Sequence, residues 1–325
     1  MSTSPAFRGP MRAEFDAFAT LMHSTGGRHL TLLTIIARFD KYLAQHHPNA
    51  KTLTKPLLLQ WFGTFEKLSL TAQCRYRTAV FQLCKYLHRR NQATAMRSDF
   101  LPFRRTSTFR PYIFSTAEIA ALLMAARRMQ TRPSEPMRPW SFELVLALLY
   151  TCGLRISEVV RLEVRDYEPS KGCLTVRETK FAKTRLIPLS SSARCVVDAY
   201  LDRRRTLGLG CAPGSPLRCC PCDHPPSVGT VQAGIAELMR SCGIKPLRGR
   251  GPRVHDLRHT FAVHRVLQWY REGIDVQSAL PRLVTYMGHR ELASTQRYLD
   301  LTPAVLHYAA GCFANYSESA RRREP

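Results

Sequence analysis

Apolar residues recur at helical spacing through much of the first third of the chain. They repeat at intervals of three and four residues between Leu32 and Leu43, and again between Val80 and Leu87, which is the spacing of one buried helix face. The apolar segment from Leu57 to Phe65 predicts a shorter helix between these two. We therefore expect residues 1–105 to form a helical N-terminal domain.

A change of pattern near Ser115 predicts a second domain. Residues 106–114 belong to a stretch with proline, arginine and no hydrophobic period, as expected of a linker. Ser115 and Glu118 then have the spacing of a capping box, which predicts the start of a helix that continues through Ala125. We expect this second domain to cover residues 115–325.

The second domain is expected to combine helices with a small β-hairpin. The apolar run from Phe142 to Tyr150 predicts a buried helix that ends at Gly153. Cys173–Glu178 and Leu186–Leu189 have the composition of strands and are joined by a short basic turn. The expected fold class is therefore mainly α, with a small β-hairpin or sheet in an α+β second domain.

The chain carries far more positive than negative charge. Its 48 Lys and Arg residues exceed its 24 Asp and Glu residues, which leaves a formal net charge of +24. Such an excess destabilises a compact fold unless a polyanion neutralises it. Nucleic acid is the expected partner, because phosphate contacts release counterions. A membrane surface is the weaker alternative, since the longest apolar run is too short to span a bilayer.

Two groups of basic residues are candidates for contacts with DNA. A basic run is usually a solvated helix face, but this chain also carries residues suited to binding a phosphate, so we expect a face that contacts DNA. The first group, in the predicted helices, is Arg75, Arg77, Lys85, Arg89 and Arg90, and the linker region adds Arg104 and Arg105.

The last third of the chain holds residues suited to cleaving a phosphodiester. His255 and Arg258 are three residues apart, so one helix face can present both. With Arg155 upstream, two guanidinium groups could hold the phosphate oxygens through forked hydrogen bonds. Tyr298 offers a phenolic nucleophile. Because the pKa of a phenol is about 10, Tyr298 needs a base, and His255 is the candidate.

The remaining steps of such a cleavage assign two further residues. The departing 5′-oxygen needs a proton, and Lys180 in the basic turn of the hairpin is the candidate general acid. His289, nine residues before Tyr298, would donate a hydrogen bond to the scissile phosphate.

Together these residues form an ordered series of motifs. Residues 112–305 resemble the catalytic domain of the tyrosine recombinase (phage integrase) family, and the N-terminal part resembles that family's core-binding domain more loosely. The matching segments are Gly153–Glu158, Thr179–Leu189, the His-x-x-Arg box from His255, Met287–His289 and Arg297–Tyr298.

The resemblance implies a site, a substrate and an assembly. It adds Glu158 as a carboxylate that orients the site. It implies double-stranded DNA as the partner, with four protomers (a homo-tetramer, or a tetramer shared with related recombinases) exchanging strands through a Holliday junction. Accessory DNA-bending proteins or partner recombinases are further expected partners. The catalytic set that it implies is Arg155, Lys180, His255, Arg258, His289 and Tyr298.

The hairpin departs from the family's pattern, so the general acid stays open. Thr179 and Phe181 flank Lys180 where the family often has glycine. Lys183 is therefore a rival for the same role.

No cofactor is expected, because a transesterification conserves the energy of the broken bond and needs neither metal nor nucleotide. One cluster nevertheless suggests structural zinc. Its spacing is tighter than usual and no second ligand pair follows, so we favour the interpretation without metal. The cluster comprises Cys211, Cys219, Cys220, Cys222 and His224.

The sequence thus predicts a site-specific DNA recombinase or integrase. It would act through a 3′-phosphotyrosyl intermediate in the integration, excision or transposition of a mobile element. The alternatives are a type IB topoisomerase, which relaxes DNA without exchanging strands, and a non-catalytic DNA-binding protein. The first residues lack a secretory signal pattern, so we expect the protein in the cytoplasm, on the nucleoid.

Overall fold

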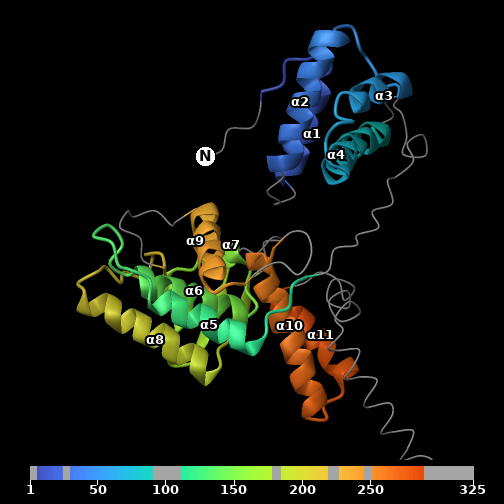
Figure 1. Ribbon diagram of the computed structural model, residues 1–325. Coiled ribbons are helices and arrows are strands. Elements are labelled where there is room, and N and C mark those ends of the chain that lie inside the picture. Colours follow the sequence, from blue (N-terminus) through green and yellow to red (C-terminus); the bar gives the residue numbers. More distant parts are fainter. Residues whose placement is uncertain are drawn as a thin grey trace, which may run out of the picture. The chain divides into compact units, whose positions relative to one another are not determined.

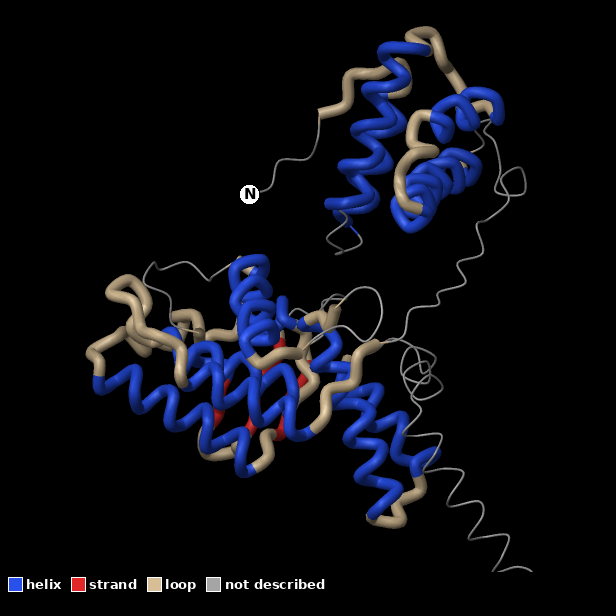
Figure 2. The backbone as a smooth tube through the Cα atoms, viewed as in Figure 1, coloured by secondary structure: helices blue, strands red, loops and turns tan. Residues whose placement is uncertain are grey.

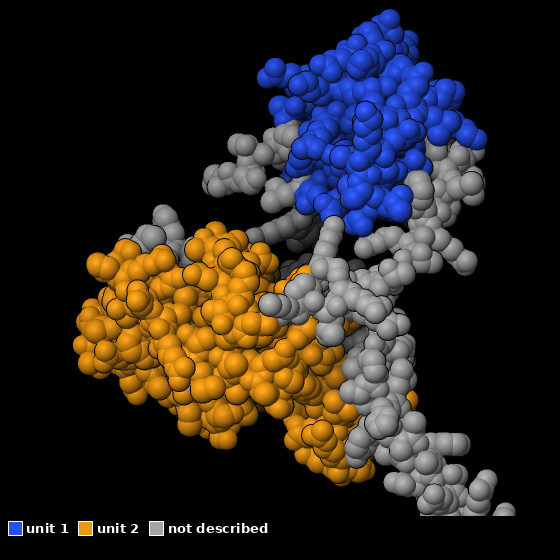
Figure 3. Space-filling model, in the orientation of Figure 1, with its two compact units in different colours: residues 1–108, 180–182 blue, residues 109–179, 183–325 orange. Residues whose placement is uncertain are grey.

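A computed structural model of the chain describes residues 6–24, 30–90, 111–177, 184–218, 227–244 and 251–288. The chain divides into two compact units, with the break between residues 108 and 109 (Figure 3). Among the helices of the described ranges, none combines the length and the apolar character that a membrane span requires.

The first unit is a helical bundle, as the apolar spacing predicts. Its core is rich in aromatic rings, with Phe39 stacked on Phe15 at a centroid distance of 6.1 Å and close to Trp61 at 5.2 Å. Burial of such large rings contributes strongly to the stability of a small core. The helices in Figure 1 are α1 (Arg12–Ser24), α2 (Leu30–His46), α3 (Lys55–Gly63) and α4 (Leu70–Arg89).

The second unit is also mainly helical. Helix α6 is buried on nearly all sides and packs against α5, α8 and α10, which confirms the buried helix predicted from its apolar run. The helices are α5 (Thr116–Arg127), α6 (Arg138–Thr151), α7 (Ile156–Val159), α8 (Ser191–Thr206), α9 (Val228–Ser241), α10 (Val254–Arg271) and α11 (Val276–Met287), with a 3₁₀ turn at Val164–Asp166.

The predicted capping box opens helix α5. The Ser115 hydroxyl accepts a hydrogen bond from the backbone N–H of Glu118 at 3.1 Å, and the Glu118 carboxylate accepts one from the backbone N–H of Ser115 at 2.7 Å. Two backbone donors that the helix leaves unpaired are satisfied in this way. The prediction of a helix start at Ser115 is confirmed, and the helix extends two residues beyond Ala125.

A three-stranded antiparallel sheet completes the second unit (Figure 2, red). Its strands are β1 (Tyr167–Glu168), β2 (Cys173–Val176) and β3 (Arg185–Pro188), in the order β1-β2-β3. The predicted hairpin is confirmed with shifted ends, and β1 was not expected. In β3, Ile187 is buried and Leu186 is 64% exposed. Because side chains alternate along a strand, Arg185 lies on the same inward face as Ile187.

Helices α10 and α11 form a small core of their own. Phe261 of α10 packs with Leu280, Leu283 and Met287 of α11. Helix α11 ends at Gly288, whose φ of 66° is the left-handed conformation that commonly terminates helices. The packing of these two helices fixes the end of α11 against the start of α10.

Candidate active site

The start of helix α10 presents His255 and Arg258. The Asp256 carboxylate, 1% exposed, accepts a hydrogen bond from the backbone N–H of Arg253 at 2.9 Å and so caps the helix. A negative charge at this position also complements the helix dipole. The expected spacing of His255 and Arg258 on one helix is therefore confirmed, and the local sequence explains why the helix begins there.

Arg258 is almost fully buried, with 1% exposure. Its Nη1 donates to the carbonyl of Gly153, and its Nη2 donates to the carbonyl of Met287 at 2.6 Å. Gly153 follows helix α6 with a φ of 58°, a conformation that glycine adopts without strain. Arg258 thus joins the start of α10 to the turn after α6 and to the end of α11.

Arg155 lies beside this cluster, at the N-cap of the short helix α7. Its side chain is 23% exposed. Nη1 donates to Glu158 Oε1 at 2.8 Å, and Nη2 donates to the carbonyl of Gly288 at 3.0 Å. Arg155 therefore forms the ion pair with Glu158 and also binds the end of α11.

Glu158 is a buried carboxylate shared by two arginines. Its side chain is 1% exposed, and it accepts hydrogen bonds from the backbone and the side chain of Arg155 and from two nitrogens of Arg185. Burial alone would raise its pKa. The hydrogen bonds and positive charges of Arg185 and Arg155 outweigh burial and lower the pKa to about 2. Glu158 is consequently ionised at neutral pH.

Sequence reasoning did not identify Arg185 as a site residue. Besides Glu158, it reaches helix α11, since its Nε donates to the carbonyl of Tyr286 at 3.0 Å. Two features of the sequence point to it. Arg185 belongs to the hairpin motif, and it lies two residues before the apolar Ile187, on the same face of the strand. A charged residue on the inward face of a strand requires a buried partner, and Glu158 is that partner.

The His255 imidazole reaches solvent, although much of its surroundings is protein. This partial desolvation, followed by the positive charge of Arg258, lowers its pKa from 6.5 to about 4. The neighbouring His259 packs edge-on against it at a centroid distance of 4.7 Å. His255 is therefore neutral at physiological pH and able to accept a proton.

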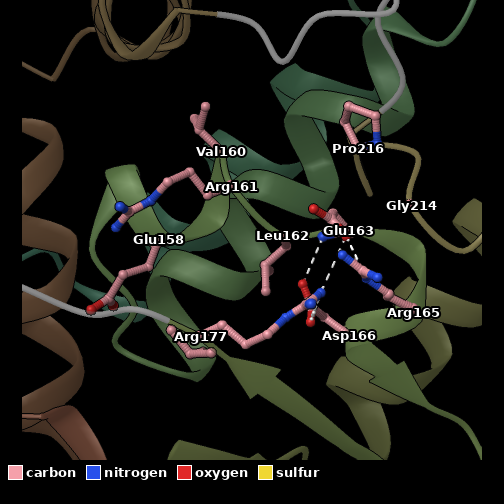
Figure 4. A pocket seen from close by; sticks show the side chains of 11 residues that line it. Glu158, Val160, Arg161, Leu162, Glu163, Arg165, Asp166, Arg177, Gly214 and Pro216 are labelled. Carbon is pink, nitrogen blue, oxygen red and sulfur yellow. Dashed lines mark hydrogen bonds and ion pairs between the residues drawn. The ribbon is translucent and has the colours of Figure 1, made fainter. Parts of the chain in front are cut away.

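The arrangement combines anion binding with a basic group. Two guanidinium groups, those of Arg155 and Arg185, share the Glu158 carboxylate, and Arg258 adds a third positive charge near the neutral imidazole of His255. Such a cluster suits a phosphate oxygen that gains charge during reaction. Glu158 also lines a hollow of about 400 Å³, which Arg177 and Asp166 line as well (Figure 4).

Several predicted site residues lie outside the described residues. They include Tyr298, the predicted nucleophile, and both candidates for the general acid. The last described residue, Gly288, directly precedes one of them in the sequence. The full set is Lys180, Lys183, His289, Tyr298, Arg104 and Arg105.

The basic residues predicted to contact DNA lie along helix α4, which belongs to the first unit. Arg75, Lys85 and Arg89 are exposed, as is Arg90 at the end of the helix. Arg77 differs, because its guanidinium lies 4.8 Å from the centre of the Phe62 ring and its side chain is only half exposed.

Of the cysteine cluster, Cys211 alone lies within the described residues. Cys211 is a half-buried free thiol, and its candidate co-ligands lie outside the described ranges. Within those ranges, no group of three potential metal ligands converges.

Comparisons with known proteins place the chain in a family. The model of the phage integrase family matches residues 114–304, more than half of the chain. The putative integrase/recombinase y4rB of Sinorhizobium fredii (strain NBRC 101917 / NGR234) is 36% identical over 214 residues, which are 65% of this chain and 68% of that protein.

Two solved structures share the fold at low sequence identity. One is the XerH site-specific recombinase bound to palindromic difH substrate in a post-cleavage complex, with a TM-score of 0.62, 18% identity, and coverage of 87% of this chain and 79% of that one. The other is a lambda integrase tetramer bound to a Holliday junction, with a TM-score of 0.60, 18% identity and coverage of 89% and 76%. The chain belongs to the phage integrase family, the DNA-cleaving and DNA-rejoining tyrosine recombinases.

Proposed function

We propose that this site-specific recombinase cleaves DNA by attack of the Tyr298 phenolic oxygen on a backbone phosphorus. The oxygen–phosphorus bond to the 5′-oxygen of the next nucleotide breaks, and a 3′-phosphotyrosyl bond replaces it. Attack by the freed 5′-hydroxyl of another strand reverses the chemistry and joins the DNA. The energy of the original bond is conserved, so no cofactor is required.

The observation that carries this proposal is the position of two arginines at one helix end. Arg155 and Arg258 bind the carbonyls of Gly288 and Met287, immediately before His289 in the sequence. A guanidinium has five N–H donors, so Arg155, which is 23% exposed, can bind a phosphate oxygen in addition to these contacts. Both arginines are fixed by protein contacts before substrate arrives, which favours stabilisation of the developing charge.

Proton transfers complete the assignment of roles. His255, neutral because its pKa is lowered to about 4, takes the phenolic proton of Tyr298. Lys180 gives a proton to the departing 5′-oxygen, with Lys183 as the rival donor. His289 donates a hydrogen bond to the scissile phosphate, and Glu158 orients Arg155.

The partner of the reaction is duplex DNA. The net charge of +24 favours a polyanion, and XerH, which shares the fold, has been solved on its difH substrate. We assign duplex binding chiefly to residues 1–105 and the chemistry to residues 115–325, joined by the linker at 106–114. The lambda integrase tetramer on a Holliday junction supports four protomers as the working assembly, acting on the ends of a mobile element.

A nicked suicide substrate tests the proposal. DNA carrying candidate element ends, nicked beside the scissile phosphate, loses the short fragment that carries the freed 5′-hydroxyl, and this loss traps the adduct. We expect wild-type protein and a Tyr167→Phe control, which loses a hydroxyl bound to Asp198, to form a covalent complex that survives denaturation. Tyr298→Phe should bind the DNA and form none. An adduct with Tyr298→Phe, or none with wild type on bound DNA, contradicts the assignment.

The products separate recombination from relaxation. With two sites present, recombinant joints between them are expected. Relaxed circles without such joints would identify a topoisomerase instead.

A further inference from the structure

Arg185 makes a two-pronged contact with the buried Glu158. Its Nη2 donates to Glu158 Oε2 at 2.9 Å and its Nη1 donates to Oε1 at 3.2 Å. Parallel bonds of this kind fix direction as well as distance, because both groups are planar. The carboxylate is held by Arg155 from another direction. Arg185 and Arg155 therefore share one fixed anion.

The same arginine is also bound to the end of helix α11. Its Nε donates to the carbonyl of Tyr286 at 3.0 Å. Its guanidinium also lies against Gly288, where an added Cβ would stand 3.0 Å from Nη1 and 3.1 Å from Cζ. A residue other than glycine could not accept this approach without displacing Arg185. Arg185 thus contacts helix α11 on both sides of Met287.

The three side-chain nitrogens of Arg185 are directed at protein groups. Its side chain is 12% exposed, and each of its three nitrogens already donates to Glu158 or Tyr286. Arg155, by comparison, is 23% exposed. The contacts of Arg185 run to protein groups that themselves adjoin the site.

We propose that Arg185 is a positioning residue of the cleavage centre, which fixes Glu158 against Arg155 and fixes the end of α11 against the same cluster. The proposal rests on the proposed function. Through Arg185, one network of hydrogen bonds joins strand β3, Arg155 and helix α11. Arg155 is the proposed phosphate-binding residue, and α11 precedes His289 and Tyr298 in the sequence. Loss of Arg185 should therefore slow chemistry without abolishing DNA binding.

Two variants and a matched control test this role. Arg185→Gln removes the charge and the fork, while Arg185→Lys keeps the charge and loses the fork. The control is Arg177→Gln. Arg177 follows strand β2 on the same sheet and pairs with Glu163 at 3.2 Å and with Asp166 at 2.5 Å (Figure 4). It has the same chemistry as Arg185 but contacts neither Glu158 nor α11 through any of these bonds.

The measurement is the single-turnover rate of adduct formation at saturating nicked DNA, with the dissociation constant and the melting temperature determined for each protein. We expect Arg185→Gln to cleave about 100-fold more slowly, because a small misplacement of reacting groups has an effect of this size on the rate. Its DNA affinity should change about fivefold or less, as for one exposed charge. Arg185→Lys, the more conservative variant, should fold and lose less rate, and Arg177→Gln should match wild type.

A substrate with sulfur in place of the bridging 5′-oxygen separates a loss of positioning from a loss of the general acid. A thiolate leaves without a proton, since thiols have a pKa of about 8.5. If Arg185 acts through Glu158, Arg155 and α11, the sulfur substrate does not restore the rate. Restoration would show that Arg185 only places the general acid, and the proposal would be wrong.

Three other results would also overturn the role. They are a rate for both Arg185 variants close to wild type, an equal rate loss in Arg177→Gln, and a rate loss accounted for by the unfolded fraction at the assay temperature. If wild-type protein bound the nicked DNA and formed no adduct, the proposed function itself would fail, which is a distinct outcome.

Discussion

Arg155 and Arg258 donate hydrogen bonds to successive carbonyls of one helix end. Nη2 of Arg155 binds the carbonyl of Gly288 at 3.0 Å, and Nη2 of Arg258 binds that of Met287 at 2.6 Å. Carbonyls at the C-terminus of a helix lack partners within the helix and carry partial negative charge. Binding them with cations both satisfies the helix end and sets the separation of the two guanidinium groups.

Under the proposed function, this relationship would couple phosphate binding to the position of the segment that follows α11. Arg258 is buried, with 1% exposure, and Arg155 is 23% exposed. A displacement of the end of α11 would therefore shift the side chains of both Arg155 and Arg258.

His255 should remain a competent base well below neutral pH. Its pKa is lowered from 6.5 to about 4, so the imidazole stays neutral until the pH approaches that value. We expect the single-turnover cleavage rate to show no loss near pH 6.5 attributable to His255. His255→Gln should lower the rate about 100-fold, whereas His264→Gln, which removes a partner of Tyr150, should not. An inflection near 6.5 that vanishes in His255→Gln would contradict this.

Local sequence patterns predicted helices α2 to α6 and the hairpin of β2 and β3, whereas β1 was not expected. Apolar spacing predicts such helices because it reports the buried face directly. The capping box at Ser115 and the pair His255 and Arg258 involve residues three apart, and a helix fixes their geometry. These features depend on neighbours in the chain, so no knowledge of the fold was needed.

The role of Arg185 could not be read in the same way. Hydrophobicity alone would place Leu186 inside and Arg185 outside, but the structure has the opposite arrangement. The reversal depends on partners 27 and 101 residues away, Glu158 and Tyr286. Only the assembled fold brings those partners to the start of β3. Arg77 of α4 is a second residue whose environment depends on another helix, because it packs on Phe62 of α3.

Replacement of Gly153 by alanine should destabilise the second unit. Its φ is 58°, and an added Cβ would lie 2.4 Å from Cδ1 of Phe261. The backbone strain costs about 1–2 kcal/mol, and overpacking adds about 1–3 kcal/mol. Gly243→Ala is the matched control, because Gly243 has a φ of 67° and open space around it. Denaturant unfolding should show a loss at least about 1 kcal/mol larger for Gly153→Ala; equal losses would mean that Phe261 moves freely.

Glu158→Gln should reduce stability and its dependence on acid pH. Removing one member of a buried ion network costs about 3 kcal/mol. The pKa of Glu158 is about 2 in the folded protein and 4.5 without these contacts. Because the folded pKa is the lower one, the unfolded chain binds more protons between these values, and stability is lost as the pH falls from about 4.5 to 2.

The control for this prediction is Glu163→Gln. Glu163 is 31% exposed and pairs with Arg165 and Arg177, so its loss should cost about 1 kcal/mol or less at neutral pH. Free energies of unfolding from denaturant titrations at neutral and acid pH measure both effects. Equal losses in the two variants would show that Glu158 contributes no more than an exposed ion pair.

A bridging-sulfur substrate should decide between the two candidate lysines. Alanine at the true general acid should lower cleavage of ordinary DNA about 100-fold. The same variant should cleave the sulfur substrate at nearly the wild-type rate, because a thiolate needs no proton to leave. We expect this pattern for Lys180→Ala and not for Lys183→Ala. The reverse pattern would assign Lys183, and restoration of neither would place the acid elsewhere.

The basic residues of α4 should differ in what they contribute to DNA binding. Arg75 is exposed, so a phosphate contact by it releases about 0.9 counterions, and Arg75→Ala should reduce the slope of log K against log salt by about that amount. Arg77 packs on the Phe62 ring, and Arg77→Ala should instead lower the stability of the first unit by about 1 kcal/mol. Arg12→Ala, on the 70% exposed Arg12 of helix α1, is the control for a surface charge without a DNA contact. Unchanged slopes in all three variants would move the DNA-binding face away from α4, and a change in Arg77→Ala larger than in Arg75→Ala would show that packing on Phe62 is given up when DNA binds.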